Sequence, residues 1–254
     1  MQLHFQRYGQ GPPLIILHGL FGSSENWHSI SQKLASDLAV FAVDQRNHGR
    51  SPHAGEMTYE LMAQDLELFV TNQHLSPVHL LGHSMGGKTA MVFALTYPEL
   101  AEKLIVVDIA PRAYPPQHRQ ILDAMLSLDL SSSKNRNDID AQLAKSIPDL
   151  TLRQFLLKNV KRDAAGAFHW QMNLAAINAN YDRLNGALPD SRTFDKPILF
   201  IRGERSDYIR NDEIELIQAR FPQAEFCEVA DAGHWVHADA PESFLRKVRE
   251  FLQR

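Results

Sequence analysis

Six short apolar runs, separated by segments of helical periodicity, constrain the fold of this chain most strongly. The runs are Leu14–Leu17, Leu38–Val43, Val78–Leu81, Leu104–Val107, Ile198–Ile201 and Phe226–Val229. Several of them are continuously apolar, which is typical of strands that are buried on both faces. Between them, Tyr59–Gln73 repeats apolar residues at the spacing of one helix face. This order predicts an α/β fold with a mostly parallel sheet and helices on both faces.

The stretch from residue 112 to residue 192 interrupts this alternation. It contains no strand-like run, and prolines and serines separate four amphipathic segments. These segments are His118–Leu130, Asp138–Ser146, Leu152–Lys161 and Trp170–Leu184. Strand-like runs resume after Lys196, so a separate C-terminal domain is not expected. We predict a core formed by residues 1–111 and 193–254, with residues 112–192 inserted between two core strands as a helical cap.

Composition limits the partners that the chain can have. Its 254 residues carry a formal net charge of −4 and no cluster of Lys and Arg, so neither a nucleic acid nor an anionic membrane surface is expected as a partner. No apolar stretch approaches the roughly 20 residues that span a bilayer, and the N-terminal residues do not resemble a leader peptide. The single cysteine, Cys227, excludes an intrachain disulfide. A soluble, cytoplasmic protein is expected.

The sequence G-H-S-M-G-G follows the run Val78–Leu81 and precedes a helical pattern. A G-x-S-x-G motif in this position places its serine on a tight strand-to-helix turn, with strained backbone angles that expose the hydroxyl. Gly82 and Gly86 are needed because a side chain there would collide with the neighbouring strand or helix. The backbone N–H of Met85 would donate to an oxyanion at the start of the helix. Ser84 is therefore the predicted nucleophile, in preference to a plain glycine-rich turn.

A second glycine-containing turn, H-G-L-F-G-S-S, begins at His18, directly after the run Leu14–Leu17. In enzymes with a serine elbow, the second oxyanion amide comes from a loop after an early strand. Leu20 and Phe21 are both candidates for this backbone donor, and Phe21 is preferred. The His18 imidazole is expected to hold the loop through hydrogen bonds.

A histidine follows the last apolar run, in the sequence D-A-G-H-W-V-H from residue 231 to residue 237. Of the twelve histidines, His234 alone lies in a Gly-His loop after the last strand, where it would reach the serine as general base. Asp231, His234 and His237 are also spaced like metal ligands. No cysteine, second carboxylate cluster or H-E-x-x-H motif completes such a site, so no metal is expected and His237 is interpreted as structural.

The acid that orients His234 has two candidates. Asp108 ends the run Leu104–Val107, where burial of a carboxylate is unfavourable unless it is paired. The run Ile198–Ile201 leads to G-E-R-S-D, where the acid is expected three residues after the glycine, and that position is Ser206. Asp207 comes one residue late. Asp108 is favoured, with Ser206 as a supporting hydroxyl; Asp207 is the alternative acid, and Asp108 would then be a loop cap.

Five motifs together resemble the α/β-hydrolase superfamily across nearly the whole chain: H-G-L-F-G-S, D-Q-R-N-H-G-R-S, G-H-S-M-G-G, V-D-I-A-P and A-G-H-W-V-H-A-D-A-P-E. The resemblance implies an esterase or thioesterase with a helical cap that uses neither a cofactor nor a metal. It places Ser84 and His234 in the catalytic machinery, with the amides of Phe21 and Met85 in the oxyanion hole. The chain departs from the commonest pattern of the superfamily at Ser206, which leaves the acid open.

The expected substrate is a small acyl ester or thioester, with acyl-CoA included, cleaved through an acyl-serine intermediate. A serine nucleophile argues against the haloalkane dehalogenases and epoxide hydrolases of this fold, which use aspartate. Cofactor-free haloperoxidases, carbon–carbon bond hydrolases and non-catalytic receptors stay open as alternatives. Asp44 and Arg46 in the second motif are expected to form an ion pair within their turn. The apolar candidates for the cap side of the substrate pocket are Met125, Phe155, Trp170, Met172, Leu174 and Tyr208.

Overall fold

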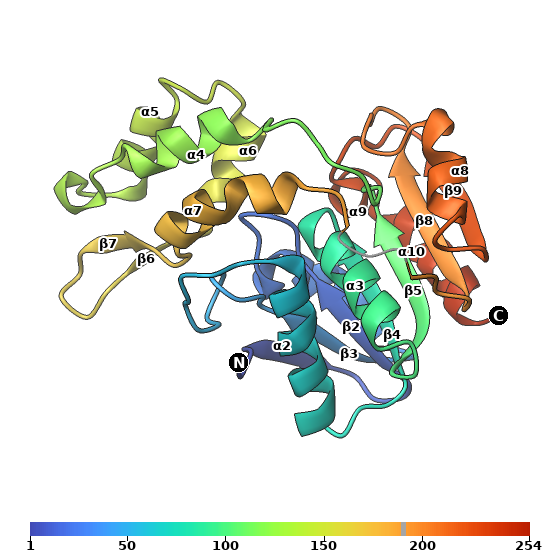
Figure 1. Cartoon of the computed structure of the whole chain (residues 1–254). Helices are drawn as coiled ribbons and strands as arrows, with labels where there is room; N and C mark the ends of the chain where they lie inside the picture. The colour runs from blue at the N-terminus through green and yellow to red at the C-terminus, as the bar shows by residue number, and fades with distance from the viewer. Residues whose placement is uncertain (189–191) are drawn as a thin grey trace.

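A computed structural model describes residues 1–188 and 192–254, and within them a seven-stranded sheet has the order β1-β3-β2-β4-β5-β8-β9 (Figure 1). The strands are β1 (Phe5–Tyr8), β2 (Pro13–Leu17), β3 (Ala39–Val43), β4 (Val78–His83), β5 (Ala101–Val107), β8 (Ile198–Gly203) and β9 (Ala224–Val229). β1 pairs antiparallel with β3, whereas the other pairs are parallel. Each of the six apolar runs falls on a parallel strand, which confirms the predicted fold class.

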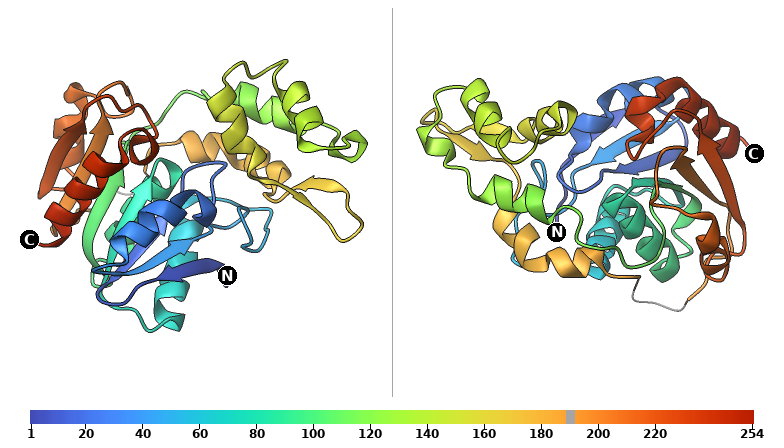
Figure 2. Two further views of the ribbon diagram at one scale, coloured as in Figure 1. Left: turned by 180° about the vertical axis from the view of Figure 1, so that it is seen from behind. Right: turned by 90° about the horizontal axis from the view of Figure 1, so that it is seen from above.

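Helices cover both faces of this sheet, as Figures 1 and 2 show. One face packs against α2 (Tyr59–Asn72), α3 (Met85–Thr96) and α8 (Ile214–Gln218), and the other packs against α1 (His28–Leu34) and α10 (Pro241–Leu252). Successive residues of a strand point to opposite faces, so Ile15 enters the first core while Leu14 and Ile16 enter the second. Burial on both faces explains why the strands are continuously apolar.

The segment between β5 and β8 forms a separate group of elements at the carboxyl ends of the strands (Figure 1). Its helices are α4 (Arg119–Leu126), α5 (Arg136–Leu143), α6 (Leu150–Leu157) and α7 (Leu174–Asn185). The boundary predicted at residue 192 follows residues 189–191, which lie outside the described residues. Shorter helical elements elsewhere in the fold are α9 (Val236–Asp239) and the 3-10 turns Ser24–Trp27, Leu130–Ser132 and Asn211–Glu213.

The prediction that the insertion lacks strands is wrong. β6 (Val160–Arg162) and β7 (Phe168–Trp170) form an antiparallel hairpin where helical segments were expected to end and begin. Strands of three residues are too short to show a period of two. Gly166 closes the hairpin with φ +85°, a conformation that favours glycine. The edge strand β1 was likewise not predicted, because its sequence F-Q-R-Y mixes polar and aromatic residues.

The predicted ion pair between Asp44 and Arg46 is also wrong. Asp44 accepts hydrogen bonds from the backbone N–H groups of Ser24 (2.6 Å) and Arg50 (2.9 Å). Arg46 instead pairs with Asp65 on α2, with Nε 2.6 Å from Oδ2. Both side chains still fix the turn after β3, but each does so through a partner from another part of the chain.

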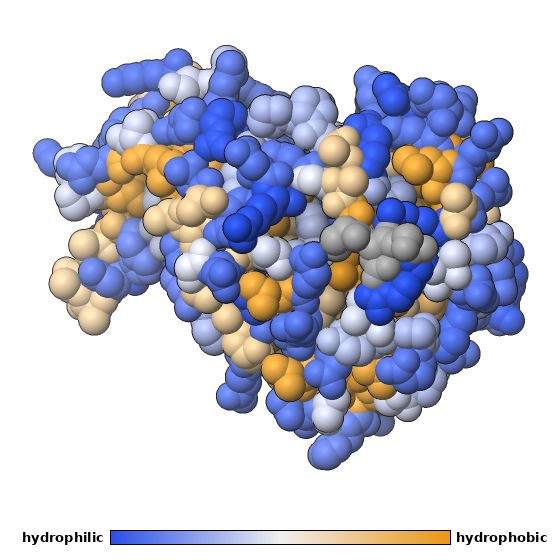
Figure 3. All heavy atoms as spheres, in the orientation of Figure 1, coloured by the Kyte–Doolittle hydropathy of each residue, from blue (hydrophilic) through white to orange (hydrophobic). Residues whose placement is uncertain are grey.

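One face of the molecule is mostly hydrophilic (Figure 3). Figure 3 shows one face on which hydrophilic residues predominate and apolar residues are scattered in small groups. In the two described parts of the chain, every helix is too short or too polar to cross a membrane.

Candidate active site

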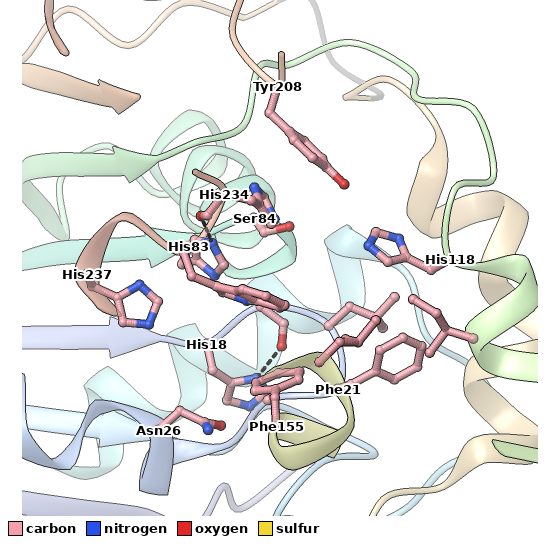
Figure 4. Close-up of a pocket in the computed structure, with 16 residues that line it drawn as sticks. His18, Phe21, Asn26, His83, Ser84, His118, Phe155, Tyr208, His234 and His237 are labelled. Atoms are coloured by element: carbon pink, nitrogen blue, oxygen red, sulfur yellow. Dashed lines mark hydrogen bonds between the residues drawn. The ribbon is translucent and has the colours of Figure 1, made fainter. Parts of the chain in front are cut away.

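Ser84 occupies the turn between β4 and α3. Its backbone has φ +53° and ψ −118°, a strained combination for a residue with a side chain. A Cβ atom on Gly82 would lie 2.2 Å from the Gly86 carbonyl oxygen, and one on Gly86 would lie 2.4 Å from the carbonyl oxygen of Leu17. Both neighbours must therefore be glycine for the turn to close. The turn directs Ser84 into a cavity beneath the insertion (Figure 4).

Asp108 directly follows β5, has φ +54°, and is fully buried. Its Oδ2 lies 2.8 Å from His234 Nδ1 and also accepts a hydrogen bond from the Ser206 hydroxyl, while its Oδ1 accepts one from the Gly203 N–H at 3.2 Å. Because a carboxylate only accepts, Nδ1 of His234 carries the hydrogen, which leaves Nε2 as an acceptor. The buried carboxylate is thus satisfied by three donors that converge on it.

Asp207, the alternative acid, takes no part in this arrangement. Its side chain is exposed, and its backbone carbonyl oxygen accepts a hydrogen bond from Arg112 at 3.5 Å. The structure therefore brings Asp108 and Ser206 to His234 and leaves the Asp207 carboxylate outside.

The loop that carries His234 is held from three directions. His83 Nε2 bonds the His234 carbonyl oxygen at 2.9 Å, and the Arg205 N–H donates to the Ala232 carbonyl at 2.9 Å. A Cβ atom on Gly203 would lie 2.3 Å from the Gly233 carbonyl oxygen, so the end of β8 must be glycine for the loop to approach. The Tyr208 ring stacks on the His234 ring, with centroids 3.9 Å apart. The positioning contacts of His83 and Tyr208 were not predicted, because they link loops far apart in the sequence.

Within the described residues, no hydrogen bond joins Ser84 Oγ to the His234 ring, although both side chains line the same cavity. Such contacts are commonly long in a ligand-free active site and shorten when substrate binds.

The two backbone amides considered for an oxyanion differ from the prediction at one position. The Met85 N–H opens α3 and therefore has no partner within its helix. The Phe21 N–H, which was preferred, donates to His48 Nε2 at 3.3 Å, and Phe21 itself has φ +62°. In the described part of the chain the Leu20 N–H has no such partner, and Leu20 lines the cavity beside Ser84. This geometry argues against Phe21 and favours Leu20.

His18 holds this loop as expected. Its Nδ1 bonds the Gly19 carbonyl oxygen at 2.9 Å, and its Nε2 accepts from the Gln45 N–H at 3.0 Å. The Gln45 side-chain amide donates to the His18 carbonyl oxygen at 2.7 Å. The loops after β2 and β3 are thereby joined beside the cavity.

The cavity has a volume of about 230 Å³ and two chemically different sides. Its apolar side is formed by Phe21 together with Ile121, Leu152 and Phe155 from the insertion, and by Trp235. Its polar side presents Asn26, His83 and His237 (Figure 4). Of the predicted lining residues, Phe155 and Tyr208 line it; Met125, Met172 and Leu174 are buried in the core, and Trp170 packs against that core.

The predicted structural role of His237 agrees with its surroundings. Its ring stacks on Trp27 with centroids 4.1 Å apart. Among the described residues, no group of three or more His, Cys, Asp or Glu side chains is arranged to hold a metal ion.

Burial keeps several histidines around the cavity uncharged. It lowers the pKa of His48 to about 3, with His18 contributing, and that of His237 to about 3, with His234 contributing. Burial likewise lowers the pKa of His118 to about 4. These rings are therefore neutral at neutral pH, and the His48 ring bonds the Phe21 N–H and the Arg46 carbonyl oxygen.

A fall in pH from 7 to 5 is expected to reduce the free energy of unfolding by about 4 kcal/mol through His48 and His237, about 2 kcal/mol from each. The unfolded chain binds a proton on each ring near its ordinary pKa of 6.5, whereas the folded chain binds one only near pH 3. Stability is therefore lost as the pH falls below 6.5. Urea titrations at pH 7 and pH 5 measure the loss. His48→Gln should reduce it by about half, and equal stability at both pH values would contradict the prediction.

The chain is similar in sequence and in structure to known proteins. A family model described as the alpha/beta hydrolase fold matches residues 12–241. The chain is 38% identical over 257 aligned residues to the sn-1-specific diacylglycerol lipase ABHD11 of Danio rerio, which covers 98% of this chain and 81% of that protein. It is 34% identical over 250 residues to esterase YbfF of Escherichia coli K12, covering 97% and 95%. A solved structure of a marine microorganism esterase matches with a TM-score of 0.97 and 44% identity, covering 98% and 99%.

Proposed function

The chain belongs to the α/β-hydrolase fold family, and from that premise we propose that it hydrolyses small acyl esters and acyl thioesters, acyl-CoA included, through an acyl-serine intermediate. The observation that carries the proposal is the 2.8 Å contact between Asp108 and His234 in the cavity that Ser84 enters from a strained turn. The similarity to a diacylglycerol lipase and to two esterases supports ester hydrolysis.

In the proposed first step, Ser84 Oγ attacks the substrate carbonyl carbon while His234 Nε2 accepts its proton. Asp108, supported by the Ser206 hydroxyl, holds the ring in the tautomer that leaves Nε2 free and stabilises the charged ring as it forms. The N–H groups of Met85 and Leu20 donate to the oxyanion, each lowering the barrier by about 3–4 kcal/mol.

The second step releases the acid and restores the enzyme. His234 gives its proton to the departing alcohol or thiol, and then activates a water that attacks the acyl-serine carbonyl. The bond from the acyl carbon to Ser84 Oγ then breaks, and His234 gives the proton taken from the water to Oγ as the new carboxylic acid forms. The chain's own residues thus supply every proton transfer in the cycle.

We also propose that residues 112–192 act as a cap over this site. Ile121, Leu152 and Phe155 come from that segment and form much of the apolar wall of the cavity. The wall suits a hydrocarbon acyl group. A volume of about 230 Å³ is below the roughly 300–1,000 Å³ of sites for drug-sized ligands, which supports a small acyl group.

A series of p-nitrophenyl esters from acetate to laurate, together with acetyl-CoA and butyryl-CoA, tests the proposal. We expect hydrolysis of the short and medium esters and thioesters, with rates that fall once the acyl chain outgrows the cavity. A fluorophosphonate should label the protein at Ser84 with one adduct per chain. Failure to cleave any ester or thioester, together with absence of the adduct, would contradict a serine hydrolase.

A further inference from the structure

Lys88 carries a buried amine that the proposed chemistry does not use. It lies on α3 one turn after the nucleophile, with its N–H bonded to the Ser84 carbonyl oxygen at 3.1 Å, and only 1% of the residue is exposed. Its Nζ donates to the carbonyl oxygens of Arg112, at 2.8 Å, and Gly186, at 2.5 Å. One amine thus bonds the chain where it leaves the core after β5 and where it returns after α7.

The two connections that Lys88 bonds are also joined to each other. The Tyr114 N–H donates to the Asn185 carbonyl oxygen at 2.8 Å, and the Leu188 N–H donates to the Pro111 carbonyl oxygen at 3.1 Å. We call residues 110–116 and 184–188 the entry and exit stalks of the insertion. Figure 1 shows the chain passing from β5 to α4 and coming back from α7 towards the sheet.

Two aromatic rings complete the environment of the amine. Nζ lies 4.9 Å from the Tyr114 ring centroid and 5.5 Å from that of Tyr59. The Tyr59 hydroxyl donates to the Leu184 carbonyl oxygen at 2.6 Å, so this ring is itself fixed to the exit stalk. Ring faces attract a cation, and the attraction is strongest where water is excluded.

Burying an amine is unfavourable, and an apolar side chain would fill the same space without that penalty. Burial, with Arg112 nearby, lowers the pKa of Lys88 to about 7. The compensation comes from two stalk carbonyl groups, from the Tyr114 ring of the entry stalk and from the Tyr59 ring of α2, all of which surround Nζ. Removing the amine would leave both carbonyl groups without this donor.

We propose that Lys88 is a positioning residue that fastens both stalks of the insertion to the nucleophile helix. The fastening itself does not depend on the proposed function. Its expected effect on substrate binding does rest on that function, because the insertion supplies the apolar wall of the cavity. The contacts also extend toward the base. The Tyr114 hydroxyl donates to the Tyr208 carbonyl oxygen at 2.6 Å, and the Tyr208 ring stacks on His234.

Hydrogen exchange of the Lys88→Met variant tests the fastening directly. The amides of Tyr114 and Leu188 should exchange about tenfold faster than in the wild type, because a buried hydrogen bond to each stalk is lost. Lys103→Met is the matched control, since Lys103 Nζ also donates to two backbone carbonyls, those of Phe251 (3.2 Å) and Leu252 (3.0 Å), but lies away from the insertion. In that variant both stalk amides should keep their wild-type rates.

Steady-state kinetics separates positioning from a general loss of stability. In Lys88→Met the KM for p-nitrophenyl hexanoate should rise about tenfold, with a change of less than about threefold in kcat for p-nitrophenyl acetate, whose acyl group is too short to use the wall. Lys88→Arg keeps a donor for both carbonyls and should recover part of the stalk protection. Lys88→Gln, whose shorter amide is neutral but still carries N–H groups, replaces Lys88→Met if the latter does not fold.

The exchange measurement decides the proposal independently of activity. If the stalk amides of Lys88→Met exchange no faster than those of Lys103→Met, Lys88 does not fasten the insertion. If the wild type cleaves no ester while the stalk amides still respond to Lys88→Met, the hydrolase assignment fails and the fastening stands. A KM unchanged in a variant with faster stalk exchange would remove the link between the fastening and substrate binding.

Discussion

Replacement of Ser84 by alanine is expected to lower kcat for ester hydrolysis about 10⁶-fold. The variant loses the atom that forms the acyl intermediate, and no other hydroxyl side chain lines the main cavity apart from Tyr208 in the described chain. Rate above the uncatalysed reaction should persist at about 10³–10⁴-fold, because the amides of Met85 and Leu20 still stabilise the oxyanion. Stopped assays with p-nitrophenyl butyrate at high enzyme concentration measure the residual rate.

Two further measurements make this result specific. The thermal unfolding midpoint should stay within a few degrees of the wild type, since within residues 1–188 and 192–254 no hydrogen bond involves Ser84 Oγ. The double variant Ser84→Ala/His234→Ala should be no slower than Ser84→Ala alone, because the two residues act as one unit. A Ser84→Ala variant with wild-type kcat would overturn the assignment of the nucleophile.

Substitution of Asp108 by asparagine is expected to lower kcat about 10⁴-fold. An asparagine amide can donate to His234 Nδ1, which would stabilise the ring in the wrong tautomer, with its hydrogen on Nε2. It would also meet the Ser206 hydroxyl and the Gly203 N–H, which both donate to the carboxylate in the wild type. The pH dependence of kcat/KM for p-nitrophenyl butyrate in the variant measures how the substitution changes the protonation of His234, the proposed base.

Asp207→Asn is the matched control for this substitution, because Asp207 lies next to Ser206 and has an exposed side chain. Its kcat should stay within about twofold of the wild type, as is usual for a surface position. A large loss in Asp207→Asn with little change in Asp108→Asn would move the acid to the loop after β8. Asp108 would then be a buried cap for the Gly203 N–H.

The parallel sheet could be predicted because the residues of each strand show by themselves that the strand is buried. Leu104–Val107 and Ile198–Ile201 are continuously apolar, so both of their faces are recognisable as buried from the sequence. The hairpin of β6 and β7 could not be predicted, since strands of three residues show no period. The turn at Ser84 was predictable for a different reason, because its glycines are required by contacts within the motif and the adjacent strand.

The parts that sequence alone left open depend on contacts between distant segments. Asp108 and Asp207 both follow parallel strands, and only the adjacency of β5 and β8 shows which carboxylate faces His234. Leu20 and Phe21 are adjacent candidates for the second oxyanion amide. The Phe21 N–H already donates to His48, which lies on another loop, and this contact favours Leu20. The contacts of Lys88 could not be predicted from a motif, because its acceptors are backbone carbonyl oxygens 24 and 98 residues away.

The position of Asp108 at the end of β5 gives the chain an order of assembly during synthesis. The proposed nucleophile, acid and both oxyanion amides belong to the first 108 residues, whereas the base is 126 residues beyond the acid. A nascent chain therefore carries a serine without its base until the loop after the edge strand β9 has joined the sheet. We therefore expect activity only after the C-terminal part is in place, and a cut within the insertion would separate the proposed nucleophile and acid from the proposed base.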